Sequence, residues 1–143
     1  MCLVKCHKLN INEDIICYKY VTVKLDGYLY QSPVRKNTFW QIGKQKEIKN
    51  LTGEISEYKA KLLHNSYIDK INGCAYHTFE NLEDAMTYAS FGSPRHYAIL
   101  KCIIPKSSKY VFKGENFEGK QSYASQKLKP IEIVKVTAEE VFV

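Results

Sequence analysis

The sequence predicts a single α+β domain, built mostly from antiparallel strands with two short helices. Three observations lead to this prediction. The chain has 143 residues, which is the size of one ordinary domain with its own core. Its hydrophobic share of 45% and charged share of 25% are average for a globular protein. Runs rich in β-branched and aromatic residues outnumber the two segments with helical periodicity, so we expect residues 1–143 to form one mostly stranded domain.

The strongest local signal is a β-hairpin near the N-terminus. Residues Ile15 to Leu25 are rich in β-branched and aromatic side chains and alternate from Tyr18 onward. Asp26-Gly27 follows, and then a second short run from Tyr28 to Ser32. An Asp-Gly pair between two such runs is typical of a tight hairpin turn, because both turn residues must take positive φ.

Two segments have the spacing of amphipathic helices. The first runs from Gly53 to His64. The second begins after Asn81, which is suited to be its N-cap, and Tyr88 is expected to face away from its apolar side. Four apolar residues of this second helix share one face: Leu82, Ala85, Met86 and Ala89.

The second half of the chain adds further strands. Tyr97 to Ile104 is apolar at nearly every position, as expected of a strand that is covered on both faces. Lys109 to Lys113 predicts a short strand, and Leu128 to Val136 a longer one that alternates around Pro130. The polar, glycine-containing stretch from Gly114 to Ser125 is predicted to be a loop that could close over a site.

The charge balance bears on the kind of partner. The formal net charge is +6, but nearly all of the positive charge is lysine, and the two arginines are Arg35 and Arg95. Arginine is the residue that makes bidentate hydrogen bonds to guanine edges and to phosphates. The lysines are scattered along the sequence and form no basic cluster. Nucleic acid is therefore a less favoured partner, although it stays open. A composition rich in Lys, Ile, Asn and Tyr suggests an AT-rich genome, such as that of a phage or a low-GC bacterium.

The cysteines and the absence of targeting signals indicate a cytoplasmic protein, in the host cytoplasm if a phage encodes it. No apolar run approaches the length of a membrane span, so we expect no membrane partner. Cys2, Cys6 and His7 could form half of a zinc site, but the second half is missing. We therefore expect no metal and no cofactor. The five cysteines are odd in number and irregularly spaced, which favours reduced and mostly buried thiols: Cys2, Cys6, Cys17, Cys74 and Cys102.

Candidate binding residues collect where a strand gives way to a helix. Tyr76, His77 and Thr78 end the strand that precedes the second helix, and strand-to-helix junctions commonly hold ligands. Arg95 lies in the loop after that helix and is the best single candidate for an anion contact. Trp40 has two interpretations: it fills one end of the core together with its apolar neighbours Phe39 and Ile42, or it stacks on a base.

These segments resemble the ADP-ribosyltransferase-like fold, the family of NAD-using toxins and poly-ADP-ribose polymerases. Gly73-Cys-Ala-Tyr76-His-Thr followed by Ala85-Met-Thr-Tyr88-Ala89 is similar to the family's strand and helix with small residues and a tyrosine. The resemblance also places Ser122 to Ser125 near the family's catalytic-glutamate segment. It places Leu29 to Ser32 where the first strand presents an arginine or histidine to NAD. The segment around Tyr76 also resembles stretches of small uncharacterised phage proteins.

The sequence departs from that family where the chemistry is performed. The family's glutamate supplies negative charge where positive charge develops on the ribose, but the matching segment here reads Tyr123-Ala-Ser. Gln31 stands where the family has an arginine or histidine, and Glu115 and Glu118 lie upstream in the predicted loop. The resemblance thus implies a cleft that keeps its shape without its acid.

Three functions remain open. The first is non-enzymatic binding or sequestration of a nucleotide-like anionic ligand, for example in phage counter-defence. The second is an enzyme: an ADP-ribosyltransferase-like protein acting on NAD through Glu115 or Glu118, or a hydrolase with His77 as general base. The third is a protein-binding inhibitor of a host enzyme. We lean toward binding without catalysis and name no catalytic residue. The candidate ligand-binding residues are Tyr30, Gln31, Ser32, Trp40, Tyr76, His77, Thr78, Tyr88, Arg95, Ser122 and Tyr123.

Overall fold

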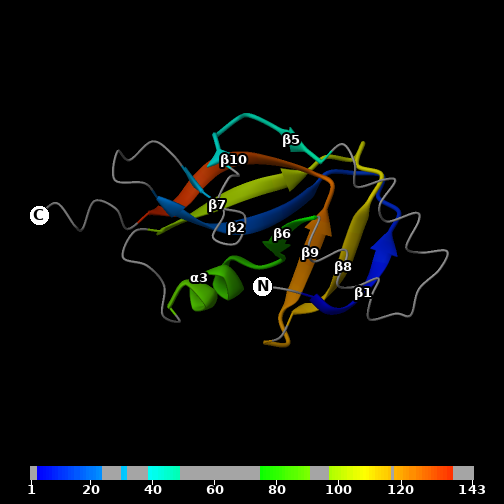
Figure 1. Cartoon of the computed structure of the whole chain (residues 1–143), viewed down its shortest axis with the longest axis horizontal. Helices are drawn as coiled ribbons and strands as arrows, with labels where there is room; N and C mark the ends of the chain where they lie inside the picture. Colours follow the sequence, from blue (N-terminus) through cyan, green and yellow to red (C-terminus); the bar gives the residue numbers. More distant parts are fainter. Residues whose placement is uncertain are drawn as a thin grey trace, which may run out of the picture.

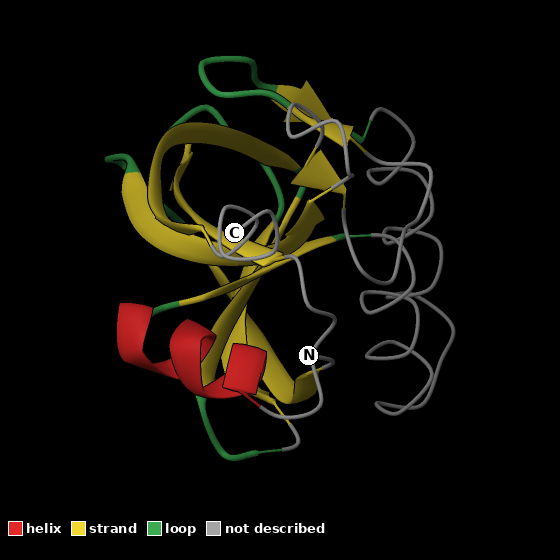
Figure 2. Ribbon diagram, turned by 90° about the vertical axis from the view of Figure 1, so that its left-hand side faces the viewer, coloured by secondary structure: helices red, strands yellow, loops and turns green. Residues whose placement is uncertain are grey.

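Most of the described chain is one antiparallel sheet that curls into a half-barrel, with one helix packed outside it (Figures 1 and 2). The computed structural model describes residues 3–23, 30–31, 39–48, 75–90, 97–116 and 118–136. The prediction of mostly antiparallel strands is confirmed, but over these residues the fold is mostly β rather than α+β, because segments expected to be irregular form strands. The helix predicted from Gly53 to His64 lies outside the described residues.

The sheet runs in the order β1-β8-β9-β6-β2-β7-β10-β5, with β3 pairing with β2 and β4 off this path. Every pairing in it is antiparallel. Within the described part of the chain, no helix is both long and apolar enough to cross a membrane. The elements are β1 Leu3–Leu9, β2 Ile15–Val23, β3 Tyr30–Gln31, β4 Phe39–Trp40, β5 Lys46–Glu47, β6 Tyr76–Phe79, α3 Leu82–Ser90, β7 Tyr97–Ile104, β8 Val111–Asn116, β9 Gln121–Ser125 and β10 Lys127–Val136.

The predicted N-terminal hairpin is confirmed in its pairing. Thr22 pairs with Gln31 and Val23 with Tyr30, which joins β2 to β3. The Asp26-Gly27 turn lies outside the described residues.

The centre of the sheet is formed by β2, β7 and β10. β7 spans Tyr97–Ile104, as predicted, and pairs with β2 along eight residue pairs. β10 pairs with β7 on one side and with β5 on the other, and its register shifts after Pro130. Proline has no N–H to give to a ladder, so a register shift at this residue is expected. The Pro130 carbonyl accepts a hydrogen bond from the Gly43 N–H at 2.8 Å, which ties the segment before β5 to β10.

The predicted loop from Gly114 to Ser125 is wrong, because this stretch forms most of a β8–β9 hairpin. The turn is built around Asn116, whose Oδ1 accepts hydrogen bonds from the N–H groups of Glu118 at 2.9 Å and Lys120 at 3.1 Å. Gly119 takes a φ of +75°, which an L side chain rarely adopts. Small and polar residues therefore serve a tight hairpin here rather than a mobile loop.

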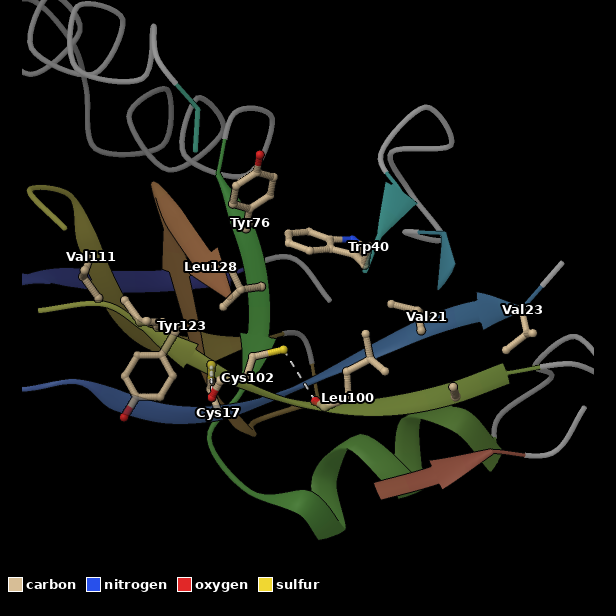
Figure 3. Packing of buried hydrophobic residues seen from close by; sticks show 12 residues of the cluster. Cys17, Val21, Val23, Trp40, Tyr76, Leu100, Cys102, Val111, Tyr123 and Leu128 are labelled. Carbon is tan, nitrogen blue, oxygen red and sulfur yellow. Dashed lines mark hydrogen bonds between the residues drawn. The ribbon is translucent and has the colours of Figure 1, made fainter. Parts of the chain in front are cut away.

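The sheet has an inner face, inside the curl, and an outer face on which α3 lies (Figure 2). The outer face packs the buried Ala85 and Ala89 of α3 against Tyr20, Phe79 and Ile99. The inner face buries a larger cluster, and Figure 3 shows its side chains: Cys17, Val21, Val23, Trp40, Tyr76, Ala98, Leu100, Cys102, Ile104, Val111, Tyr123 and Leu128.

Two details of the predicted core are wrong. Met86 was expected on the buried side of α3, yet it is 37% exposed, and Tyr88 packs instead, with its ring centroid 5.2 Å from that of Tyr20. The outer face is lined by aromatic rings, so it accommodates another ring edge-on. Trp40 is fully buried, as the core interpretation predicts, but its neighbours Phe39 and Ile42 are 37% and 40% exposed.

Candidate functional site

A row of polar side chains crosses the inner face of the sheet at the end where β1, β8, β9 and β6 lie side by side (Figure 1). His7 pairs with Lys113, Lys113 pairs with Tyr123, and Tyr123 pairs with Thr78. Residues directly opposite each other on antiparallel strands project to the same face. The four residues therefore form one cross-strand row. We call it the polar row.

Lys113 is the centre of the polar row. Its Nζ lies 5.6 Å from the centroid of the Tyr123 ring and 3.2 Å from Oε1 of Glu80, the residue that follows β6. The side chains of Lys113 and Glu80 are 29% and 32% exposed, so solvent reaches the pair. The hydrogen bond to Glu80 raises the pKa of Lys113, which keeps the ammonium charged. Burial raises the pKa of Tyr123, although nearby Lys113 opposes the shift, so its hydroxyl stays protonated.

A small hollow adjoins this row. Its volume is about 270 Å³, and Cys6, His7, Gly114, Glu115 and Gln121 line it. Glu115 pairs with Gln121 two residues along from the pair of Lys113 and Tyr123, so the hollow and the polar row are neighbours. Pockets for drug-sized ligands span about 300–1,000 Å³. The hollow is therefore of a size for one small group, such as a phosphate, rather than for a whole dinucleotide.

A second lysine belongs to the same face but is buried. Lys19 of β2 is 4% exposed, and its Nζ donates a hydrogen bond to the His77 carbonyl oxygen at 2.9 Å. The same Nζ lies 5.5 Å from the centroid of the Trp40 ring, within cation–π range. The inner face thus carries positive charge at Lys113 near solvent and at Lys19 in the interior.

Three of the predicted ligand residues meet in the inner cluster. The ring centroids of Trp40 and Tyr76 are 4.9 Å apart, edge to face, and Tyr123 belongs to the same cluster. Trp40 is fully buried, and Tyr76 and Tyr123 are each 7% exposed. In Figure 3 the hydroxyl end of Tyr123 is directed away from Tyr76. Trp40 and Tyr76 therefore form core, whereas Tyr123 connects that core to the polar row.

Other predicted residues lie on the outer face. Tyr88 packs there against Tyr20 and Phe79. Ser122 is buried and its Oγ accepts a hydrogen bond from the Asn116 amide at 3.3 Å, which supports the β8–β9 turn. His77 alternates with Tyr76 and Thr78 along β6, so its imidazole projects to the outer face while its carbonyl receives Lys19.

The remaining predicted residues are described in part or not at all. Tyr30 pairs in register with both Val23 and Trp40, and Gln31 pairs with Phe39. The side chains of Tyr30 and Gln31, and the whole of Ser32 and Arg95, lie outside the described residues.

Sequence reasoning missed the charged residues of the site. Lys19 carried a signal, because alternation along β2 puts it in phase with the buried Cys17, Val21 and Val23. A lysine in the buried phase of a strand is rare unless its charge is used or paired. Lys113 and Glu80 carried no such signal, since they meet across β9.

The cysteines of the inner face are suited to packing and not to chemistry. Burial raises the pKa of Cys17 from 9.0 to about 12, against weaker opposing effects of the Thr78 hydroxyl and Lys19. Burial also raises the pKa of Cys102, which lies opposite Cys17 in the ladder. A thiol is nucleophilic only as the thiolate, so both groups are inert near neutral pH. Within the described ranges, no three His, Cys, Asp or Glu residues are grouped to hold a metal ion.

Comparisons of the chain with known proteins found no match to a family model, to a curated protein or to a solved structure.

Proposed function

We propose that the protein binds a nucleotide-like anionic small molecule at the polar row of its inner face. The single observation that carries this proposal is the position of the Lys113 ammonium. It stands over the Tyr123 ring, partly exposed to solvent and beside a hollow of about 270 Å³. The ammonium offers a charged hydrogen-bond donor for a phosphate group.

The proposed role is sequestration. A protein that binds such a ligand without consuming it lowers the free concentration of that ligand, which suits a phage protein that suppresses a host signalling nucleotide. The ligand panel should therefore include signalling nucleotides as well as NAD.

Isothermal titration calorimetry at low ionic strength tests the proposal, with AMP, NAD, ADP-ribose and a set of cyclic dinucleotides as ligands. We expect one of them to bind. Lys113→Met should weaken its binding about tenfold, because a charged hydrogen bond to phosphate is worth roughly 1.5 kcal/mol or more. Lys109→Met, at an exposed lysine in the turn before β8, is the matched control and should change little. Absence of binding by the unmodified protein throughout the panel would end the proposal.

Glu80 favours a second candidate, an ADP-ribosyltransferase-like enzyme acting on NAD. Its carboxylate lies at the edge of the polar row, 3.2 Å from Lys113, and Glu115 borders the adjoining hollow. Such an enzyme needs a carboxylate where positive charge develops on the ribose. NAD consumption should then be measured for the unmodified protein and for Glu80→Gln, Glu115→Gln and Glu118→Gln. Undiminished NAD after prolonged incubation would remove this candidate and leave sequestration.

A further inference from the structure

The lysine that is proposed to receive the ligand already has an anion beside it. Glu80 Oε1 lies 3.2 Å from Lys113 Nζ, which is hydrogen-bond and ion-pair distance. The two residues are separated by β9, over whose Tyr123 ring the lysine reaches. A bound phosphate would compete with the Glu80 carboxylate for the same ammonium charge.

Glu80 is placed so that its side chain can leave without disturbing the sheet. The residue stands immediately after β6, and its N–H donates to the Gln121 carbonyl at 3.1 Å, which fixes the main chain. The Glu80 side chain is 32% exposed, so on rotating away from Lys113 its carboxylate enters water. An ion pair with this exposure is weak because water screens it, so a ligand can readily displace the carboxylate.

We propose that Glu80 is a built-in competitor for Lys113, whose carboxylate an incoming anion must displace. This inference rests on the proposed function. Coulomb attraction to the ammonium grows with the charge of the ligand, whereas the cost of displacing Glu80 is the same for every ligand. A singly charged group merely exchanges one charge for another and gains little from this contact. A doubly charged phosphate monoester gains more than it displaces, so the site should prefer a phosphate monoester to a singly charged phosphodiester.

AMP and 3′,5′-cyclic AMP are suitable probes, because they share base and sugar. At about pH 8 the monoester of AMP carries nearly two negative charges, since its second pKa is about 6, whereas the cyclic diester carries one. We expect the unmodified protein to bind AMP at least about fivefold more tightly than cyclic AMP, because the nucleotides differ by one charge at Lys113.

Glu80→Gln removes the competitor and keeps the length of the side chain. Affinity for both nucleotides should then rise about three- to fivefold, the range expected on removal of a partly exposed ion pair. Glu83→Gln is the matched control, because it removes the same charge from an exposed position in the first turn of α3. Its effect should stay below about 1.5-fold, as general screening predicts. Thermal melting of each variant checks that the fold is retained.

A double-mutant cycle assigns the effect to Lys113. In a Lys113→Met background, Glu80→Gln should no longer increase affinity, because the ammonium for which Glu80 and the ligand compete is absent. The inference is overturned if Glu80→Gln leaves the affinity unchanged or lowers it, or if the gain persists without Lys113. If neither nucleotide nor any ligand of the panel binds to the unmodified protein or to Glu80→Gln, the proposed function itself fails and this inference falls with it.

Discussion

The ammonium of Lys19 donates a hydrogen bond to the carbonyl oxygen of His77 at 2.9 Å, so a side chain of β2 is bonded to the main chain of β6 inside the half-barrel. The ladder between these two strands is short, with the pair of Tyr18 and Phe79 in register. Lys19 therefore stabilises the sheet, because its hydrogen bond joins β2 to β6 where the main-chain ladder between them has few hydrogen bonds.

Lys19→Ala should destabilise the protein by about 2–4 kcal/mol, because it removes both the hydrogen bond and the buried aliphatic stem. Lys19→Met keeps the volume and should cost about 1 kcal/mol, mostly for the lost bond. Urea unfolding followed by circular dichroism measures both, with the exposed Lys44→Ala as control. A methionine variant as unstable as the alanine variant would show that packing of the stem is unimportant.

Trp40 and its neighbour Phe39 differ in burial, which allows a matched pair of truncations. Trp40 is fully buried against Tyr76, whereas Phe39 on the same short strand is 37% exposed. Trp40→Ala should therefore cost about 3–5 kcal/mol, as truncations of large buried aromatic residues do. Phe39→Ala should cost less than about 1 kcal/mol. Chemical denaturation followed by circular dichroism compares the two variants, and equal losses would contradict the assignment of Trp40 to the core.

The hairpin between β8 and β9 depends on the Asn116 side chain. Its Oδ1 accepts two main-chain N–H groups and its amide donates to Ser122. Asn116→Ala should cost about 1–3 kcal/mol, because two part-buried N–H groups and the buried Ser122 hydroxyl lose their partner. Asn116→Asp keeps the acceptor oxygen and should retain most of the stability. The urea unfolding midpoints of the two variants test this prediction. An Asn116→Asp variant as unstable as Asn116→Ala would contradict the role of Oδ1 as the acceptor in the turn.

The buried thiols make the protein sensitive to alkali. The pKa of Cys17 is raised from 9.0 to about 12, and that of Cys102 is shifted in the same direction. Above pH 9.0 the thiols ionise in the unfolded chain but stay protonated in the folded one, so the unfolded state binds fewer protons. This contribution is complete below that pH and is lost as the pH rises toward 12.

Urea midpoints at about pH 8 and about pH 10.5 should therefore differ, with the lower stability at the higher pH. Cys17→Ala should lower stability at both pH values but reduce the difference between them. If the alanine variant keeps the full alkaline loss, groups other than Cys17 are responsible for it.

The strands that could be predicted were those with the apolar or alternating sequence pattern of a buried strand. β2, β7 and β10 follow apolar or alternating runs, and α3 follows its spacing of small residues. The start of β8 lies within the strand predicted from Lys109 to Lys113, but the rest of β8 and the whole of β9 could not be found in this way, since their buried positions include Gly114, Ser122 and Ser125. The two serines can be buried because Ser122 Oγ accepts a hydrogen bond from the Asn116 amide and Ser125 Oγ donates one to the Lys127 carbonyl oxygen. These partners are fixed only in the folded chain.

The candidate site was predicted less completely, for a related reason. Tyr76, Trp40 and Tyr123 were predicted as ligand contacts because aromatic rings can stack on a ligand. All three belong to one buried cluster, but Trp40 and Tyr76 are core residues of it. The polar row arises from the register of strands that are distant in the sequence, so His7 and Lys113 become neighbours only in the folded sheet. The spacing of residues along the sequence does not show which strands will pair or in which register.

The most direct test of the account is a titration of the isotope-labelled protein with AMP, followed by residue-resolved NMR chemical shifts. We predict the largest changes at Lys113, Tyr123 and Gln121, with small changes at Tyr20 and Tyr88 on the outer face. Shift changes confined to the α3 side, or none at millimolar ligand, would contradict binding at the inner face.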